Sequence, residues 1–109
     1  MREVAGLAVL TLRDLPEGAV EAAATFYREH LEMARRAATT ADLAIVLDPV
    51  PHDHSDWRRA LARDLARKNA PRRVNVIAGG EGGELEEVLA FLAEAPGVTG
   101  QYLELGGQD

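Results

Sequence analysis

The feature that most restricts the fold of this 109-residue chain is a regular alternation of four short β-rich runs with three helical patterns. The β-rich runs cover residues 4–12, 43–47, 73–78 and 99–105. The first two are almost continuously apolar, as is typical of parallel strands covered on both faces, whereas the fourth alternates and suits a sheet edge. Strands that alternate with helices over short connections predict a parallel α/β sheet within one domain, residues 1–109.

The three helices are expected over residues 17–37, 55–69 and 84–94. Pro16 precedes the first helix, Ser55 is a suitable N-cap for the second, and Pro71 ends the second helix. The first helix has a wide apolar stripe, which Phe26 and Met33 broaden further. The members of the stripe are Val20, Ala23, Ala24, Tyr27, Leu31 and Ala34.

The composition excludes several classes of site and compartment. The chain has no cysteine, so a disulfide framework, a thiolate metal site and a cysteine nucleophile are excluded. The longest apolar run, residues 4–10, is too short to cross a bilayer, and the N-terminus lacks the apolar core of a signal peptide. We therefore expect a cytoplasmic protein without a membrane partner.

The net charge of −6 is unevenly distributed. Residues 51–76 carry seven Lys or Arg and three acidic residues, whereas residues 77–109 carry seven acidic residues and no Lys or Arg. The basic segment includes a stripe at helical spacing, Arg59, Arg63 and Arg67. This pattern fits either two solvated faces or a contact between copies of the chain. An acidic chain with few aromatic residues among its arginines does not predict a nucleic-acid partner.

Three motifs resemble the second half of the short-chain dehydrogenases/reductases. They are LARDLA at residues 61–66, Arg73-Val74-Asn75, and VTGQ at residues 98–101 followed by LELGG at 103–107. Residues 30–47 resemble the preceding helix and strand more loosely. The resemblance implies the family's fourth to seventh strands, and therefore a small Rossmann-like α/β domain of two or three layers. Its β-α-β-α-β-α-β order would give a four-stranded parallel sheet in the strand order 1-2-3-4.

The same resemblance implies that the family's reaction has been lost. No glycine-rich turn for a nicotinamide cofactor occurs near residues 10–18. The positions of the catalytic tyrosine and lysine fall near Leu47 and Pro51, and the serine position falls within residues 47–49, which contain no hydroxyl group. The only lysine is Lys68, near the end of the second helix. We therefore expect no enzymatic activity, no catalytic residue, no cofactor and no assigned metal site.

Two loops at the expected carboxyl ends of the strands remain candidate sites. The first has ligand types suited to a divalent cation, or it is a polar loop in which Asp53 or Ser55 caps the next helix. Its candidate ligands are Asp48, His52, Asp53, His54 and Asp56. The second, residues 79–83, has glycine amides that could hold a phosphate, but Glu81 and the acidic helix start make a tight turn the simpler interpretation.

Right-handed crossovers along a linear sheet place consecutive helices on one face, which leaves part of the other face bare. We therefore expect a homodimer or larger homo-oligomer that covers the sheet through the first two helices or the last strand. Trp57, Tyr27 and Phe26 are candidate interface anchors. The predicted function is a non-catalytic interaction or regulatory module. The alternative is a small ligand-binding, metal-binding or hydrolytic protein that uses Asp48, His52 and His54.

Overall fold

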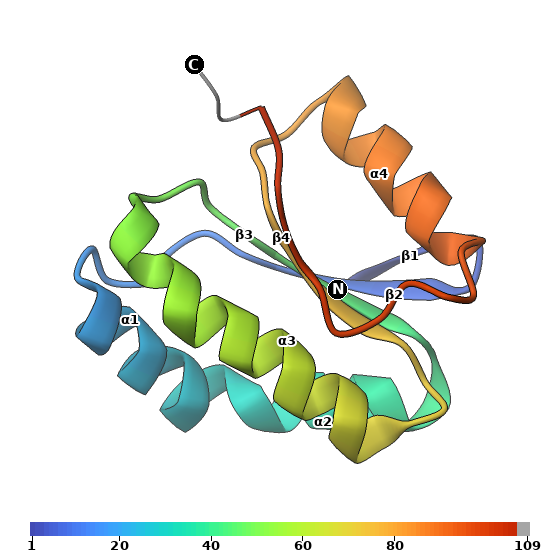
Figure 1. Ribbon diagram of the computed structural model, residues 1–109, viewed down its shortest axis with the longest axis horizontal. Coiled ribbons are helices and arrows are strands. Elements are labelled where there is room, and N and C mark those ends of the chain that lie inside the picture. The colour runs from blue at the N-terminus through green and yellow to red at the C-terminus, as the bar shows by residue number, and fades with distance from the viewer. Residues whose placement is uncertain (107–109) are drawn as a thin grey trace.

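The computed structural model describes residues 1–106, which form a five-stranded sheet in the linear order β1-β2-β3-β4-β5 (Figure 1). The strands are β1 Arg2–Val4, β2 Leu7–Leu12, β3 Leu43–Leu47, β4 Val74–Ala78 and β5 Tyr102–Glu104. Strands β2 to β5 are parallel, and β1 pairs antiparallel with β2. The predicted α/β class is confirmed, but the sheet has one strand more than the four that were expected. Gly107, the last residue of the LELGG motif, lies outside the described residues.

The additional strand arises because the predicted strand at residues 4–12 is a hairpin. Val4 pairs with Leu7, and the two residues between them both have positive φ, 49° at Ala5 and 91° at Gly6. Two positive φ angles in a two-residue connection are typical of a type I′ turn, whose twist matches that of an antiparallel strand pair. Alanine is an uncommon residue at positive φ, so the sequence lacks the usual Asn-Gly or Asp-Gly signal for this turn.

Helices cover both faces of the sheet, which gives three layers (Figure 1). One face carries α1 Ala19–Thr25, a π-helical turn η1 Phe26–His30, α2 Leu31–Thr40, a 3₁₀ turn η2 His52–His54 and α3 Ser55–Asn69. The opposite face carries α4 Gly83–Ala93, which packs Leu85, Leu89 and Leu92 on the sheet. The described residues contain no helix long and apolar enough to cross a membrane.

The position of α4 contradicts the expectation that all helices share one face. The chain moves in the same direction across the sheet at each step from β2 to β5, but α4 lies on the opposite face from α1, α2 and α3. The β4-α4-β5 crossover therefore has the opposite hand to the two crossovers before it, whereas nearly all such crossovers are right-handed. Because α4 covers this face, a bare sheet face no longer argues for a partner.

The first helical segment also differs from its predicted stripe. It runs from Ala19 to Thr40, and the Leu31 amide donates to the Phe26 carbonyl, which widens one turn. The buried side chains are separated by four or eight residues and are Ala22, Phe26, Ala34 and Ala38. In an α-helix, four residues rotate about 40° past one full turn, so side chains spaced four apart gradually move around the helix axis. The wider π-helical turn reduces this rotation and helps to keep the buried side chains on one face. Consequently Val20, Tyr27 and Met33, which were expected to face inward, are exposed.

The two motifs at residues 73–75 and 98–101 bind one another. The Asn75 side chain donates to the Val98 carbonyl and accepts from the Gln101 amide, both at 3.0 Å. The Val74 amide donates to Thr99 Oγ1 at 3.0 Å, and the Gly100 amide donates to the Val74 carbonyl at 2.7 Å. The motifs that carry the family resemblance therefore fix β5 against β4.

A second tie joins β1 to α4 at the other edge of the sheet. Arg2 donates to both carboxylate oxygens of Glu86, at 2.6 and 3.2 Å. This hydrogen bond, with the attraction of the guanidinium charge, holds the pKa of the Glu86 carboxyl below its usual range. Both side chains are exposed, so the pair contributes little to stability.

Candidate functional site

The register of the sheet aligns the carboxyl ends of four strands. Leu12 pairs with Leu47, Leu47 with Ala78, and Ala78 with Glu104. The residues that follow these strands therefore lie side by side at one edge of the sheet. Ligands of open parallel α/β sheets usually bind at this edge, which we call the carboxyl edge.

Arg13 joins three of the aligned strands at the carboxyl edge. Its Nη1 donates to Asp48 Oδ1 at 2.9 Å and to the Gly79 carbonyl at 2.7 Å. Arg13 follows β2, Asp48 follows β3 and Gly79 follows β4. The Asp48 carboxylate is therefore already paired with a cation, which reduces its value as a metal ligand or general base.

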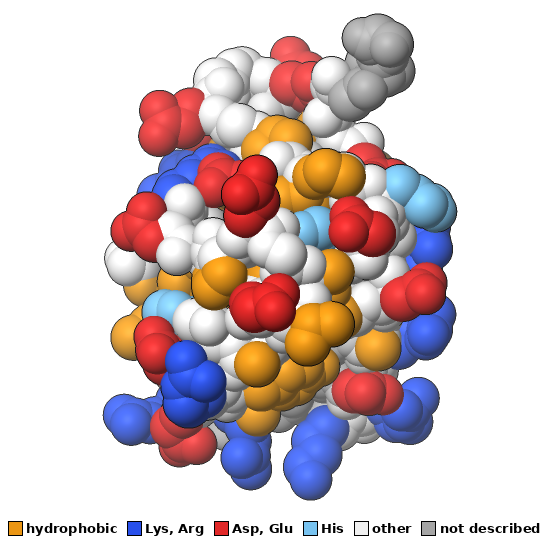
Figure 2. All heavy atoms as spheres, turned by 90° about the vertical axis from the view of Figure 1, so that its left-hand side faces the viewer, with side chains coloured by type: hydrophobic (Ala, Val, Ile, Leu, Met, Phe, Trp, Pro, Cys, Tyr) orange, Lys and Arg blue, Asp and Glu red, His pale blue; other side chains and the backbone are white. Residues whose placement is uncertain are grey.

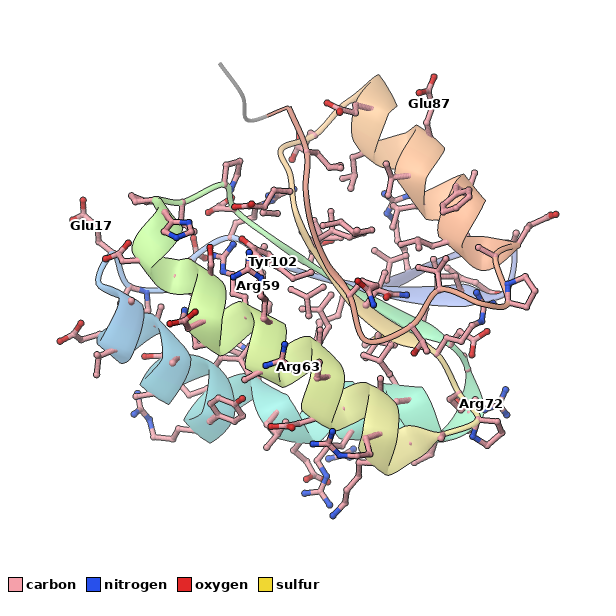
Figure 3. The ribbon with its side chains drawn as sticks, viewed as in Figure 1. Glu17, Arg59, Arg63, Arg72, Glu87 and Tyr102 are labelled. Carbon is pink, nitrogen blue, oxygen red and sulfur yellow. The ribbon has the colours of Figure 1, made fainter. Side chains whose placement is uncertain are left out.

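Arg58 contacts the backbone of Asp48 and is the largest fully buried side chain, with 1% of its surface exposed. Its Nη1 donates to the Asp48 carbonyl at 2.9 Å and to the Tyr102 hydroxyl at 3.2 Å. The guanidinium carbon lies 5.5 Å from the Trp57 ring centre and 5.9 Å from that of Tyr102. Figure 3 shows Tyr102, on β5, beside α3. The buried Arg58 Nε has no hydrogen-bond partner within residues 1–106.

A hollow of about 340 Å³ opens at the carboxyl edge beside Arg58. Its walls come from the loop after β2, the loop after β3 and the first turn of α3. Six of the nine lining residues are apolar, including Leu12, Leu15, Pro49 and Val50, and the other three are charged. The volume falls in the range of small-ligand sites. The hollow is therefore a candidate site for a small ligand at this edge.

His54, one of the candidate metal ligands, is a buried structural residue. Its Nε2 lies 2.9 Å from the Glu17 carbonyl, and its Nδ1 lies 3.2 Å from Trp57 Nε1. A carbonyl only accepts and an indole N–H only donates, so this network assigns the neutral tautomer with the proton on Nε2. Both ring nitrogens are occupied, which leaves no lone pair free for a metal ion.

The other candidate ligands of this loop do not gather around His54. His52, Asp53 and Asp56 are exposed, and His52 Nδ1 is 3.5 Å from Ser55 Oγ. Within the described part of the chain no group of three or more His, Cys, Asp or Glu side chains could hold a metal ion. Neither Asp53 nor Ser55 is the N-cap of α3, because that position is His54, whose side chain makes no capping hydrogen bond.

The glycine loop after β4 serves the fold as a close turn. A Cβ added to Gly79 would lie 3.1 Å from Leu105 Cδ1, so the loop passes close to the chain after β5. Gly82 has φ of 122°, a conformation that L side chains rarely adopt. The helix that follows has Glu84 and Glu86 in its first turn, and their charge disfavours an anion there. These features favour the turn interpretation of residues 79–83.

Arg58 is the site residue that the sequence reasoning missed. Trp57, Leu61 and Leu65 recur every four residues along this helix and indicate an apolar stripe, but Trp57 is only partly buried. Arg58 stands three residues before Leu61 and four before Ala62, so helical spacing places it on the buried face. Arg59 and Arg63, two members of the basic stripe, are exposed.

Comparison with known families agrees with the motifs described above. A family model described as short chain dehydrogenase-like protein matches residues 10–105, from the middle of β2 to the residue after β5. Comparisons with curated proteins and with solved structures give no match.

Proposed function

The chain belongs to the short-chain dehydrogenase-like family, and from this membership we propose that it is a non-catalytic member that acts as a homo-oligomeric interaction module. The main support for the proposal is the type of residue at the two positions that the resemblance assigns to the catalytic tyrosine and lysine. Leu47 is the buried last residue of β3, and Pro51 precedes the 3₁₀ turn before α3. Neither side chain can transfer or hold a proton.

The neighbouring groups do not replace the missing pair. Lys68, the only lysine, is exposed near the end of α3, whereas the carboxyl edge lies at the start of that helix. The loop after β2 holds Arg13, Asp14 and Pro16 where a dinucleotide site would need glycines that let pyrophosphate approach the backbone. These features support the absence of both hydride transfer and cofactor binding.

We expect no saturable signal when the purified 109-residue chain is titrated with a reduced nicotinamide dinucleotide, followed by nucleotide fluorescence. An active short-chain dehydrogenase under the same conditions serves as the positive control. Saturable binding in the micromolar range, which is typical of Michaelis constants, would contradict the proposal.

The helical layer supplies the surface that we assign to self-association. A groove of about 230 Å³ runs between η1, α2 and α3, with Tyr27, Leu31, Leu61 and Leu65 among its lining residues. Tyr27 is 42% exposed, and tyrosine is one of the residue types that most often anchor interfaces. Burial raises the pKa of the Tyr27 phenol, and the nearby Asp64 carboxylate adds to this rise, so the ring remains neutral.

The rim of the groove carries both signs of charge, Arg35, Lys68 and Asp64, which suits a two-fold contact between identical surfaces. Figure 2 shows Lys and Arg side chains gathered at the lower end of the molecule, where the helical layer lies, with hydrophobic atoms at the surface above them. Of the three anchors expected from the sequence, only Tyr27 is exposed: Phe26 is fully buried and Trp57 is partly buried.

Replacing Tyr27 with glutamate is expected to convert the assembly to a monomer, because a charge would enter the centre of an apolar contact. Light scattering after size-exclusion chromatography measures the change. The matched control is Phe91→Glu on α4, where a ring of similar exposure lies on the other side of the sheet and outside the groove. A wild-type chain that is monomeric at all concentrations would contradict the proposal.

The alternative function, a metal or hydrolytic site built on Asp48, His52 and His54, has less support. Asp48 is paired with Arg13, and both nitrogens of His54 are occupied. A hydrolytic site needs a free base that is within reach of a nucleophile. Within residues 1–106, Asp48, His52 and His54 do not together supply a free base and a nucleophile within its reach.

A further inference from the structure

Arg58 differs from the other internal arginines because no carboxylate neutralises it. Arg13 lies 2.9 Å from Asp48, and Arg73 lies 2.7 Å from Asp42. The ion pairs within 4.0 Å among residues 1–106 involve other arginines only. A buried charge without a counter-charge is strongly unfavourable, and the two aromatic rings beside Arg58 offset only part of this cost.

The surroundings of Arg58 leave room for a missing partner. The guanidinium uses Nη1 for two hydrogen bonds, whereas the buried Nε has no acceptor within residues 1–106. Arg58 lines the hollow of about 340 Å³ at the carboxyl edge, so an acceptor inside the hollow can approach the guanidinium. An unsatisfied buried donor beside a ligand-sized hollow indicates a ligand group that accepts hydrogen bonds and carries negative charge.

We propose that this hollow binds the carboxylate of a small organic acid, with the acid group on Arg58 and an apolar body against Leu12, Leu15, Pro49 and Val50. One unneutralised cation matches one negative charge. Asp48 and Glu17 also border the hollow, so a phosphate dianion meets more repulsion there than a carboxylate does. Glu17 points outward from the start of the first helical segment (Figure 3), and Asp48 is held by Arg13.

The chain contains one tryptophan, and this residue reports on the proposed site. Trp57 lies beside Arg58, with its ring centre 5.5 Å from the guanidinium carbon. Hexanoate is a suitable probe because it joins one carboxylate to a short apolar chain and does not absorb at tryptophan wavelengths. We expect a saturable change in Trp57 fluorescence with hexanoate. Hexanamide, which has the same shape without the charge, and inorganic phosphate are expected to bind at least about tenfold more weakly, as when a charge-assisted hydrogen bond is lost.

Substitutions locate the binding on Arg58. Arg58→Met keeps an apolar stem of similar length and is expected to weaken hexanoate binding by about tenfold or more. Arg59→Met is the matched control, because it removes an exposed neighbouring charge outside the hollow and is expected to leave the affinity within about twofold. Val50→Phe narrows the hollow without touching the charge, so it tests the proposal even if the Arg58 variant does not fold.

The inference would be overturned if the wild-type chain gave no saturable response to hexanoate, or if hexanoate and hexanamide bound with equal affinity. It would also be overturned if Val50→Phe and Arg58→Met both kept the wild-type affinity. If Arg58→Met does not fold, wild-type affinity in Val50→Phe alone would overturn it. Tighter binding of phosphate than of hexanoate would also overturn it, since the ligand class would then be wrong. Self-association through the helical groove involves other residues, so either proposal can fail without the other.

Discussion

Replacing Arg73 with alanine is expected to lower the free energy of unfolding by about 3–5 kcal/mol, the usual effect of removing one partner from a largely buried ion pair. Arg73 Nη2 donates to the Asp42 carboxylate at 2.7 Å, and Nη1 donates to the Leu92 carbonyl at 2.7 Å. Only 15% of the arginine side chain is exposed. The substitution therefore removes the cation from the Asp42 carboxylate, which keeps only the hydrogen bond from the backbone amide of residue 73, and it removes the charged donor from a helix-end carbonyl.

Chemical denaturation followed by circular dichroism measures this loss. Arg67→Ala is the matched control, because Arg67 also pairs with an aspartate, Asp64 at 2.6 Å, but on an exposed surface. Exposed pairs contribute about 0–1 kcal/mol, so the control is expected to stay within that range. Equal losses in the two variants would show that Arg73 does not join α4 to the sheet as described.

Replacing Asn75 with alanine is expected to lower the free energy of unfolding by about 2–3 kcal/mol, because two hydrogen bonds to the backbone are lost together. Asn75 is a buried polar residue on β4, and its side chain binds the Val98 carbonyl and the Gln101 amide. Without it the connection from α4 to β5 loses its attachment to β4. The same denaturation experiment measures the effect.

Gln101→Ala provides the comparison for Asn75. The Gln101 side chain is exposed, and its backbone amide still donates to Asn75 after substitution. The expected change is within about 0.5 kcal/mol, as for most surface substitutions. If Asn75→Ala proved as mild as Gln101→Ala, the mutual binding of the two family motifs would contribute little to the fold.

The sequence allowed the central elements to be predicted because their signals are local. The bounds expected for the strand at 43–47 and the helix at 55–69 coincide with β3 and α3. A continuous apolar run indicates a buried strand, and helical spacing before a proline indicates where a helix stops. The family resemblance likewise depends on short motifs, and the match over residues 10–105 confirms it.

The features that the sequence did not predict depend on tertiary structure or on an uncommon local conformation. The turn at Ala5 uses a positive φ that alanine rarely adopts, so the hairpin was read as one strand. The face that α4 covers is set by the hand of its crossover, which violates the general rule. The structural role of His54 depends on the Glu17 carbonyl, which lies 37 positions away in the sequence and leaves no local signal.

The site itself was predicted only in outline. The carboxyl edge was identified from the ends of the strands, and Arg13 and Asp48 do meet there. The buried charge of Arg58 was missed because an arginine next to Arg59 in a basic segment looks like part of an exposed face. Its spacing from Leu61 and Ala62 was the available signal, and a charged residue on an apolar stripe is a reason to look for a partner.

The lengths of the outer strands bear on how this chain behaves at high concentration. Both outer strands of the sheet, β1 and β5, are only three residues long, whereas the strands between them have five or six. Each outer strand carries charge, Arg2 and Glu3 on β1 and Glu104 on β5. Short, charged edges offer few unpaired backbone groups to a neighbouring molecule. The sheet is therefore protected against growth by strand addition, the route that leads to amyloid-like aggregates.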